Sequence, residues 1–338
     1  MHILDPSIGK EICFRYHKKD ESEKKKTEEK RMIQRRASAR MGRKVLERWQ
    51  LYLMIVPALA YLMVFAYKPM YGVLIAFKKF YMKKGVWGSP WVGFDNFERL
   101  FNSYWFPIIL KNTLTLSLLS LIIGFPVPII LALMVNEVEH PRLKKTFQTV
   151  SYAPYFISTV VVCGMITLFL SPTSGIINRF VEAMGGERVA FLQQPGMFKW
   201  IYVISGLWQG SGWSAVIYFA ALSGVDKEML EAAEIDGANR LQRVIHINLP
   251  VLVPTIVVLL ILQCGSLLNV GYEKTYLLQN DTNIAGSEII STYVYKMGLE
   301  KSDFSFSTAT GLFNSVVNSV ILITANTLSK KATQISLW

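Results

Sequence analysis

The chain has 338 residues, of which 51% are hydrophobic, and its mean hydropathy of +0.31 is too high for an ordinary soluble domain. The formal net charge of +12 is concentrated at the N-terminus, where residues 1–50 hold 15 Lys and Arg against 8 Asp and Glu. No aromatic-interleaved or helix-turn-helix pattern accompanies this charge. It therefore favours a membrane surface over nucleic acid as the partner.

Residues 1–48 are predicted to form a basic cytoplasmic tail. The charged stretch is too long for a signal peptide, and residues 18–31, KKDESEKKKTEEKR, have the composition of a disordered segment or a frayed helix. Two interpretations stay open for the tail: a solvated extension, which we favour, or an electrostatic attachment to anionic lipid.

Six apolar runs follow, each close to the twenty residues that cross a bilayer. They lie at 51–67, 112–135, about 150–170, about 200–222, about 251–271 and about 308–328. Gly124, Pro126 and Pro128 predict a kink or a break in the second run. The expected fold class is thus all-α, with residues 49–338 forming a polytopic domain of six transmembrane helices.

Lys and Arg counts in the loops predict the orientation, since cytoplasmic loops are enriched in both. With the N-terminus inside, the cytoplasmic segments hold 23 Lys and Arg and the opposite segments hold 10. The tail decides this asymmetry. Both termini are then cytoplasmic, which agrees with an even number of spans.

The first outer segment, residues 78–107, contains ten aromatic residues. The favoured interpretation is an interfacial aromatic belt with a short amphipathic helix. The alternative is a docking surface for an external partner.

The sequence offers no enzymatic or metal motif. It has no Walker A loop and no HExxH, and its three cysteines, Cys13, Cys163 and Cys264, show no disulfide or zinc spacing. The apolar runs hold almost no ionisable groups: none occurs in 112–135, 149–178 or 201–225. Ion-coupled carriers usually need such groups. Uphill transport by this chain would require energy from a partner.

One polar loop, residues 223–250, separates the fourth and fifth spans. Asp226 is placed to cap a helix over 227–235, and Gly237 can take the positive φ that ends it. A second short helix follows over 239–248, and Pro250 begins the next span. Ala232 and Ala233 expose a nearly bare backbone. The pattern predicts a rigid helix pair that enters a groove on a cytoplasmic partner.

The same loop resembles the EAA signature of ABC importer permeases, with Glu, Ala, Ala, Gly, Ile, Leu and Pro in register. The resemblance extends over roughly residues 45–338 and includes 125–138, 149–158, 175–180, 212–240 and 330–338. These segments are similar to the maltose-type superfamily, in particular its polysaccharide and oligosaccharide branch, the LplB-like group. The resemblance implies a type I ABC importer permease fold with a coupling helix in the loop. The implied ATPase-coupling residues are Glu231, Ala232, Ala233, Asp236, Gly237, Ile247, Leu249 and Pro250.

The resemblance also implies the partners. They are a second permease subunit, an ATPase dimer, an extracytoplasmic solute-binding protein, membrane lipid and a carbohydrate substrate. ATP and Mg would be bound by the ATPase, so this chain would carry no cofactor and no catalytic residue. The implied location is the bacterial cytoplasmic membrane.

Polar and aromatic residues recur at helical spacing on the last three predicted spans, and they give a candidate substrate path. The candidates are Trp208, Gln209, Trp213, Tyr218, Gln263, Ser266, Asn269, Tyr272, Glu273, Thr310, Asn314 and Asn318. Hydrogen bonding between helices, with Gly206 and Gly210 as a packing seam, is the alternative. For the whole chain, the alternatives are an ABC permease for a non-sugar solute and a membrane scaffold that transports nothing.

Overall fold

The computed structural model describes residues 49–338, and the predicted basic tail lies outside the described residues. Within this part the regular structure is helical, apart from one isolated β-bridge between Lys78 and Trp91. The chain divides into two compact units, Met1–Tyr71 and Gly72–Trp338.

The described part of the first unit is a helix that is apolar on every face. It begins as α2 (Trp49–Leu62) and continues through the π-helical turn η1 (Met63–Tyr67) into the 3-10 helix η2 (Lys68–Phe77). None of the residues in α2 or η1 is buried. Exposed apolar side chains all round a helix are typical of a membrane span whose neighbours are lipid or another subunit.

The second span predicted from the sequence is one continuous helical stretch in the second unit. It consists of α5 (Trp105–Leu119), the π-helical turn η3 (Ser120–Gly124) and α6 (Pro126–Asn136). No break occurs at the glycine and prolines. Pro126 begins α6, where its missing N–H costs little, and the wider turn η3 absorbs the irregularity.

The third predicted span is not a single straight helix. α7 (Pro141–Tyr152) and η4 (Ala153–Phe156) meet α8 (Thr159–Phe169) at an angle of 93°. The chain turns at Ile157, and the Ser158 side chain caps α8 by accepting from the Val161 N–H. The apolar run predicted over about 150–170 is therefore divided by this bend.

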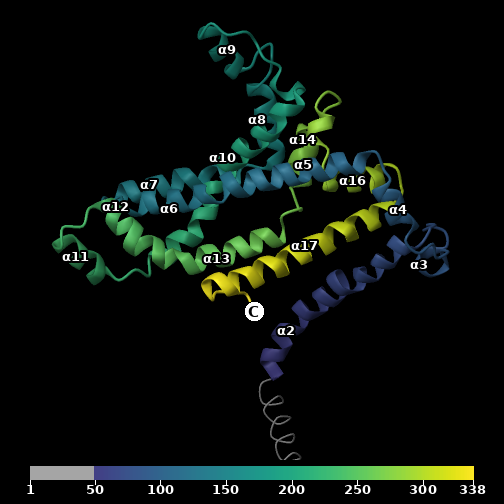
Figure 1. Ribbon diagram of the computed structural model, residues 1–338, viewed down its shortest axis with the longest axis horizontal. Coiled ribbons are helices and arrows are strands. Elements are labelled where there is room, and N and C mark those ends of the chain that lie inside the picture. Colours follow the sequence, from purple (N-terminus) through teal and green to yellow (C-terminus); the bar gives the residue numbers. More distant parts are fainter. Residues whose placement is uncertain (1–48) are drawn as a thin grey trace, which may run out of the picture. The chain divides into compact units, whose positions relative to one another are not determined.

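Three further long helices complete the second unit (Figure 1): α10 (Pro195–Leu222), α13 (Leu249–Gly265) and α17 (Phe304–Thr333). α10 packs along α6 and also touches α5, α7 and α13, while α17 runs beside α13. α7 and α10 cross very closely, because a Cβ added at Gly212 would lie 1.9 Å from the Ser151 carbonyl oxygen. Only glycine fits this crossing.

Shorter elements join these helices. They are α3 (Gly85–Gly88), α4 (Asp95–Phe101), α9 (Ile176–Ala183), η5 (Phe191–Gln193), α11 (Lys227–Ile235), α12 (Arg240–Arg243), η6 (Val244–Asn248), α14 (Tyr272–Leu278), α15 (Ile284–Ser287), α16 (Ile290–Tyr295) and η7 (Lys296–Glu300). Several of the aromatic residues in 78–107 pack on one another; Phe101 and Phe106, for example, meet edge to face with ring centroids 5.2 Å apart.

A buried ion pair fixes the segment between α14 and η7. The Lys296 ammonium lies 2.5 Å from the Glu288 carboxylate, and the Glu288 side chain is almost fully buried. Thr292 and Gln279 also donate to this carboxylate, so the charge is well satisfied.

Four helical stretches of the described chain are long and apolar enough to cross a membrane: Trp49–Phe77, Trp105–Asn136, Arg240–Gly265 and Phe304–Thr333. The bent pair α7–α8 makes up to five. α10 has 28 residues, but its serines, glycines and Gln209 keep it less apolar than these. The prediction of six spans is thus confirmed only in part.

Candidate functional site

The polar loop, residues 223–250, contains a helix over the predicted range. Asp226 caps α11 by accepting from the Glu228 N–H at 3.0 Å. Gly237 ends the helix with φ 82°, and the Ala238 N–H reaches back to the Ala233 carbonyl at 2.9 Å. The loop is therefore shaped by local signals that the sequence already displays.

A capping box begins the second helix of the polar loop. The Asn239 side chain accepts from the Gln242 N–H, and the Gln242 side chain accepts from the Asn239 N–H. The chain then passes through the π-helical turn η6 and enters α13 at Leu249, with Pro250 in the first turn. The predicted residues Ile247, Leu249 and Pro250 thus connect the loop to a long apolar helix.

The loop presents a shallow cleft of about 430 Å³. Its lining residues are Ala233, Asp236, Gly237, Ala238, Gln242, Arg243, His246 and Ile247. Glu231 and Ala232 lie exposed on α11, and Ile235 is 86% exposed. Arg243 pairs with Glu234 at 3.0 Å. The surface combines small residues, an unburied apolar side chain and charge, which suits contact with another protein.

A polar chamber lies deeper in the second unit, between α5–η3, α10 and α13. It consists of two adjoining cavities of about 180 and 260 Å³ that share Ser120, Tyr202 and Gln263. The predicted residues Gln263, Ser266 and Asn269 line it. Among the described residues, the buried Ser117 hydroxyl in the smaller cavity has no hydrogen-bond partner. An unpaired buried hydroxyl is costly unless a ligand or water meets it.

The sequence reasoning missed several residues of this chamber. They are Ser117, Ser120, Tyr202, Ser211 and Ser214. Isolated serines in apolar runs carry no distinctive pattern. The available signal was the glycine and prolines that follow Ser120, which mark an irregular helix close to the site.

An amide cluster joins the end of α13 to α17. The Asn269 Oδ1 accepts from Asn314 at 2.9 Å and from Asn318 at 3.1 Å. Asn318 also accepts from the Leu268 N–H, so it secures the chain after α13. Within residues 49–338, the Asn314 Oδ1 is buried without a partner. These three asparagines, found at helical spacing in the sequence, do meet in space.

A second cavity of about 540 Å³ adjoins this amide cluster. Asn269, Asn314 and Tyr272 line it, together with Tyr295. The rings of Tyr272 and Tyr295 are stacked, with centroids 5.2 Å apart. Aromatic faces beside amide groups are suited to the flat apolar faces and hydroxyls of a sugar.

Other predicted path residues make contacts within the protein. Gln209 donates to the Ile157 carbonyl at 3.0 Å, which satisfies the bend before α8. Trp213 stacks on Tyr155 at 4.8 Å. Tyr218 is buried in the apolar core, and Thr310 donates to the Phe306 carbonyl. Glu273 is exposed on α14. None of these residues lines the chamber or the second cavity.

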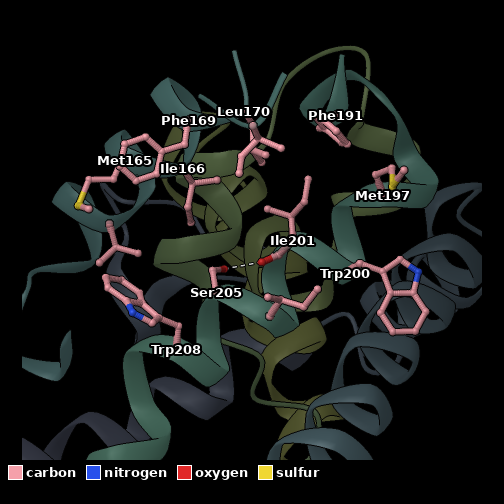
Figure 2. A pocket seen from close by; sticks show the side chains of 13 residues that line it. Met165, Ile166, Phe169, Leu170, Phe191, Met197, Trp200, Ile201, Ser205 and Trp208 are labelled. Atoms are coloured by element: carbon pink, nitrogen blue, oxygen red, sulfur yellow. Dashed lines mark hydrogen bonds between the residues drawn. The ribbon is translucent and has the colours of Figure 1, made fainter. Parts of the chain in front are cut away.

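Trp208 lies in a different place, an apolar cavity of about 610 Å³ between α8, α9 and α10 (Figure 2). Phe169, Leu170 and Trp200 are among its walls. Its one hydroxyl, on Ser205, donates to the Ile201 carbonyl of the same helix. The cavity is therefore lined almost wholly by apolar side chains, which does not suit a sugar.

A buried amine lies next to the chamber, beside Gly206. Lys274, on α14, is only 8% exposed, and its Nζ donates to the Tyr202 carbonyl at 3.0 Å. The same Nζ lies 4.8 Å from the Tyr202 ring and 3.5 Å from where a Cβ on Gly206 would be. Burial lowers the pKa of Lys274 from 10.5 to about 8.

Within residues 49–338 no three His, Cys, Asp or Glu side chains gather as a metal site would require. The candidate sites are thus a protein-contact surface on the polar loop and a polar, partly aromatic passage.

Comparisons with known proteins agree with a transport architecture. Residues 124–334 match the family model described as "binding-protein-dependent transport system inner membrane component". Protein LplB of Bacillus subtilis (strain 168) is 43% identical over 292 residues, which cover 86% of this chain and 92% of that protein. The polygalacturonan/rhamnogalacturonan transport system permease protein YteP of the same organism is 44% identical, covering 85% and 90%.

A solved structure is similar over nearly its whole length. It is a chain of a bacterial ABC transporter involved in the import of the acidic polysaccharide alginate. The TM-score is 0.81 with 42% sequence identity, covering 87% of this chain and 99% of that one. A chain of a bacterial alginate ABC transporter in complex with an alginate pentasaccharide-bound periplasmic protein gives a TM-score of 0.81 with 41% identity.

Proposed function

The chain belongs to the family of binding-protein-dependent transport system inner membrane components, and from that premise we propose that it is the transmembrane permease subunit of an ATP-driven importer for a carbohydrate. The observation that carries the proposal is the similarity to the alginate importer, 42% identical over 99% of that chain. The polysaccharide named for YteP supports the same class of solute.

Separate partner subunits would deliver the solute, complete the passage and hydrolyse ATP. A periplasmic protein carries the oligosaccharide in the alginate importer complex, and an extracytoplasmic solute-binding protein is the corresponding partner here. A second permease subunit completes the passage. An ATPase dimer binds ATP and Mg and selects between inward- and outward-facing states, since a ligand shifts only an equilibrium between states that it binds unequally.

The polar loop is the proposed contact with the ATPase. Glu231 and Asp236 provide polar contacts, and Ala232, Ala233 and Gly237 allow close approach. The exposure of α11 and its rigid capping support this role. Because the loop continues directly into α13 through Ile247, Leu249 and Pro250, movement of the loop tilts a helix that lines the chamber.

The solute is proposed to pass through the polar chamber and the adjoining cavity beside Tyr272 and Tyr295. The unpaired Ser117 hydroxyl and the unpaired Asn314 Oδ1 support this route, because each leaves hydrogen-bonding capacity for a passing hydroxyl. We place Gln263, Ser266, Asn269 and Asn314 on the path. Gln209, Trp213, Tyr218 and Thr310 are assigned to packing.

An acidic oligosaccharide is the favoured solute. Alginate is acidic, and polygalacturonan is a polymer of uronic acid. The Lys274 ammonium beside Gly206 supports this choice, because a buried cation makes the electrostatic potential nearby positive, and a positive potential attracts an anion. The proposed location is the bacterial inner membrane, with both termini and the tail of residues 1–48 in the cytoplasm.

The test is uptake by proteoliposomes that contain the complete complex and its cognate binding protein. Labelled oligogalacturonides, oligoalginates and neutral arabino-oligosaccharides are offered separately, with and without internal ATP. We expect ATP-dependent uptake of at least one acidic oligosaccharide. Glycerol 3-phosphate tests the non-sugar alternative, because permeases named for it are 24–27% identical to this chain. Uptake of that solute alone would overturn the proposal.

A further inference from the structure

The corner between α6 and α7 is a closed, rigid turn. Residues 137–140 join the two helices, and Pro141 begins α7. The Lys144 ammonium reaches back across the corner to the Asn136 carbonyl at 3.2 Å and to its side-chain oxygen at 2.9 Å. The last turn of α6 and the first turn of α7 are therefore held as one piece.

A carboxylate at this corner contacts the polar loop, 111 residues later in the chain. The Glu137 Oε1 accepts a hydrogen bond from the Asn248 Nδ2 at 2.9 Å. Asn248 is fully buried and Glu137 is half-buried. A hydrogen bond from a buried amide to a carboxylate is among the stronger ones in proteins.

A second contact between the same two segments is much more exposed. Glu139 and Arg240 form an ion pair at 2.7 Å, but their side chains are 77% and 64% exposed. Solvent screens such a pair, and it contributes little. The buried Glu137–Asn248 contact is the one that can hold the corner against the loop.

Asn248 occupies a special position in the chain. It is the last residue of the π-helical turn η6, which separates α12 from α13. π-helical turns frequently mark functional positions. Its second polar atom, Oδ1, is buried with no partner in the part of the chain that the structure describes, where the hydrogen bond to Glu137 is the only one that the Asn248 side chain makes.

The other end of α6 reaches the chamber. α6 follows directly on η3, where Ser120 lines both cavities of the chamber. α6 also packs along α10, whose Tyr202 faces the same space. A continuous helix therefore runs from the Glu137 corner to the chamber.

We propose that Glu137 is a positioning residue for transport: through its hydrogen bond to Asn248 it makes the α6–α7 corner move with the polar loop, so that α6 as well as α13 responds to the ATPase. This inference rests on the proposed function of the polar loop. Through this contact the loop would act on a third wall of the chamber, the continuous stretch α5–η3–α6, because its covalent connections reach only α10 and α13.

A reciprocal exchange of the two side chains tests the proposal. Asn248→Asp sets one carboxylate against another, so transport per ATP hydrolysed should fall about tenfold, the size expected for loss of a charged hydrogen bond. Glu137→Gln can still accept from Asn248 and should fall about threefold at most. Combining Glu137→Gln with Asn248→Asp restores an amide-to-carboxylate bond in the opposite sense, and transport should return to nearly the wild-type ratio.

Complexes are purified in full, and bound ATPase is quantified so that assembly is compared at equal occupancy. Glu139→Gln is the matched control, since it removes the exposed pair on the same corner and should leave the ratio unchanged. A double variant as poor as Asn248→Asp, or a normal ratio in Asn248→Asp itself, would overturn the role of Glu137.

A distance measurement needs no solute, so it separates this inference from the proposed function. Spin labels at the exposed positions Arg142 and Leu241, with the native cysteines replaced, report the spacing between α7 and α12. In the complete complex the spacing should be the same without nucleotide and after trapping with ATP and vanadate. Glu137→Ala, which buries no new charge, should make the spacing differ between the two states. A spacing that already differs in the wild type contradicts the proposal.

Discussion

Gly237 holds the end of α11 in a backbone conformation that other residues adopt at a cost. Its φ is 82°, and a Cβ built on it would meet no atom within 4 Å. Any penalty for a side chain therefore comes from the backbone and not from a clash. For a β-branched residue the strain is about 1–3 kcal/mol.

We expect Gly237→Val to lower solute uptake and solute-stimulated ATP hydrolysis together, because the helix end and the Ala238 contact would shift. Gly237→Asn is the control, since asparagine tolerates this region and should keep most of both activities. Both are measured in proteoliposomes with assembled complex. Normal activity of the valine variant would argue against the coupling role of the loop.

Lys274 predicts a dependence of stability on pH. Burial lowers its pKa from 10.5 to about 8, so between pH 8 and 10.5 the unfolded chain binds more protons than the folded one. The free energy of unfolding then rises with pH across this window, by about 3 kcal/mol if the whole depression is realised. Below pH 8 the charged amine is buried at full cost.

The measurement is the Tm of the purified protein at pH 7.5 and pH 10, relative to Lys274→Met at each pH. The wild type should gain roughly 4 °C on this variant at the higher pH. Lys274→Arg remains charged at pH 10 and should show no such gain. An unchanged difference between wild type and Lys274→Met would show that the amine is well solvated.

At the scale of elements, local signals predict the polar loop well. Asp226, Gly237 and Asn239 are each a cap or turn residue whose effect depends on its nearest neighbours, and the structure places a helix over the predicted 227–235. Hydropathy alone did not predict the bend between α7 and α8. Pro154 and the capping residue Ser158 are sequence signals of the bend, but they lie within an apolar run that reads as one span.

The bend itself depends on a residue from another helix, which no local pattern reveals. Gln209 on α10 donates to the Ile157 carbonyl, which has lost its helical partner. We expect Gln209→Leu to destabilise the protein by about 1–3 kcal/mol, the cost of leaving a half-buried carbonyl unpaired, with little change in the apparent affinity for solute.

Gln263→Leu should show the opposite result. Gln263 lines both cavities of the chamber, so its loss should weaken solute affinity threefold to tenfold, by about 0.5–1.5 kcal/mol, without lowering the Tm. Thermal unfolding and uptake kinetics are measured on both variants. If Gln209→Leu weakens affinity and leaves the Tm unchanged, the two assignments must be exchanged.

For the whole molecule, the sequence predicts the class of protein through apolar runs and one polar loop. The chamber could not be predicted in the same way, because it forms where three helices meet and depends on their rotation about their own axes. Asn269, Asn314 and Asn318 were found through their spacing, whereas Ser117 and Ser120 belong to a face that only the packing of α5 against α10 defines.

The orientation in the membrane remains a prediction with a direct test. Single cysteines are introduced as Ser174→Cys and Asn239→Cys, both at exposed positions. A membrane-impermeant thiol reagent should label the first from the periplasmic side and the second only after access to the cytoplasm is opened. The unsubstituted chain gives the background from its native cysteines. Labelling of position 174 from the cytoplasm would reverse the topology.

The crossing of α7 over α10 has a mechanical consequence. With the Gly212 backbone resting against the Ser151 carbonyl, no side chain interlocks the two helices at that point. Beside this point Trp213, the next residue of α10, stacks on Tyr155 in η4, and the two segments are held together there. A single methyl group at position 212 would collide with the Ser151 carbonyl and push the two helices apart. One missing methyl group thus sets how closely α7 approaches α10, beside Ser211 and Ser214, which line the chamber.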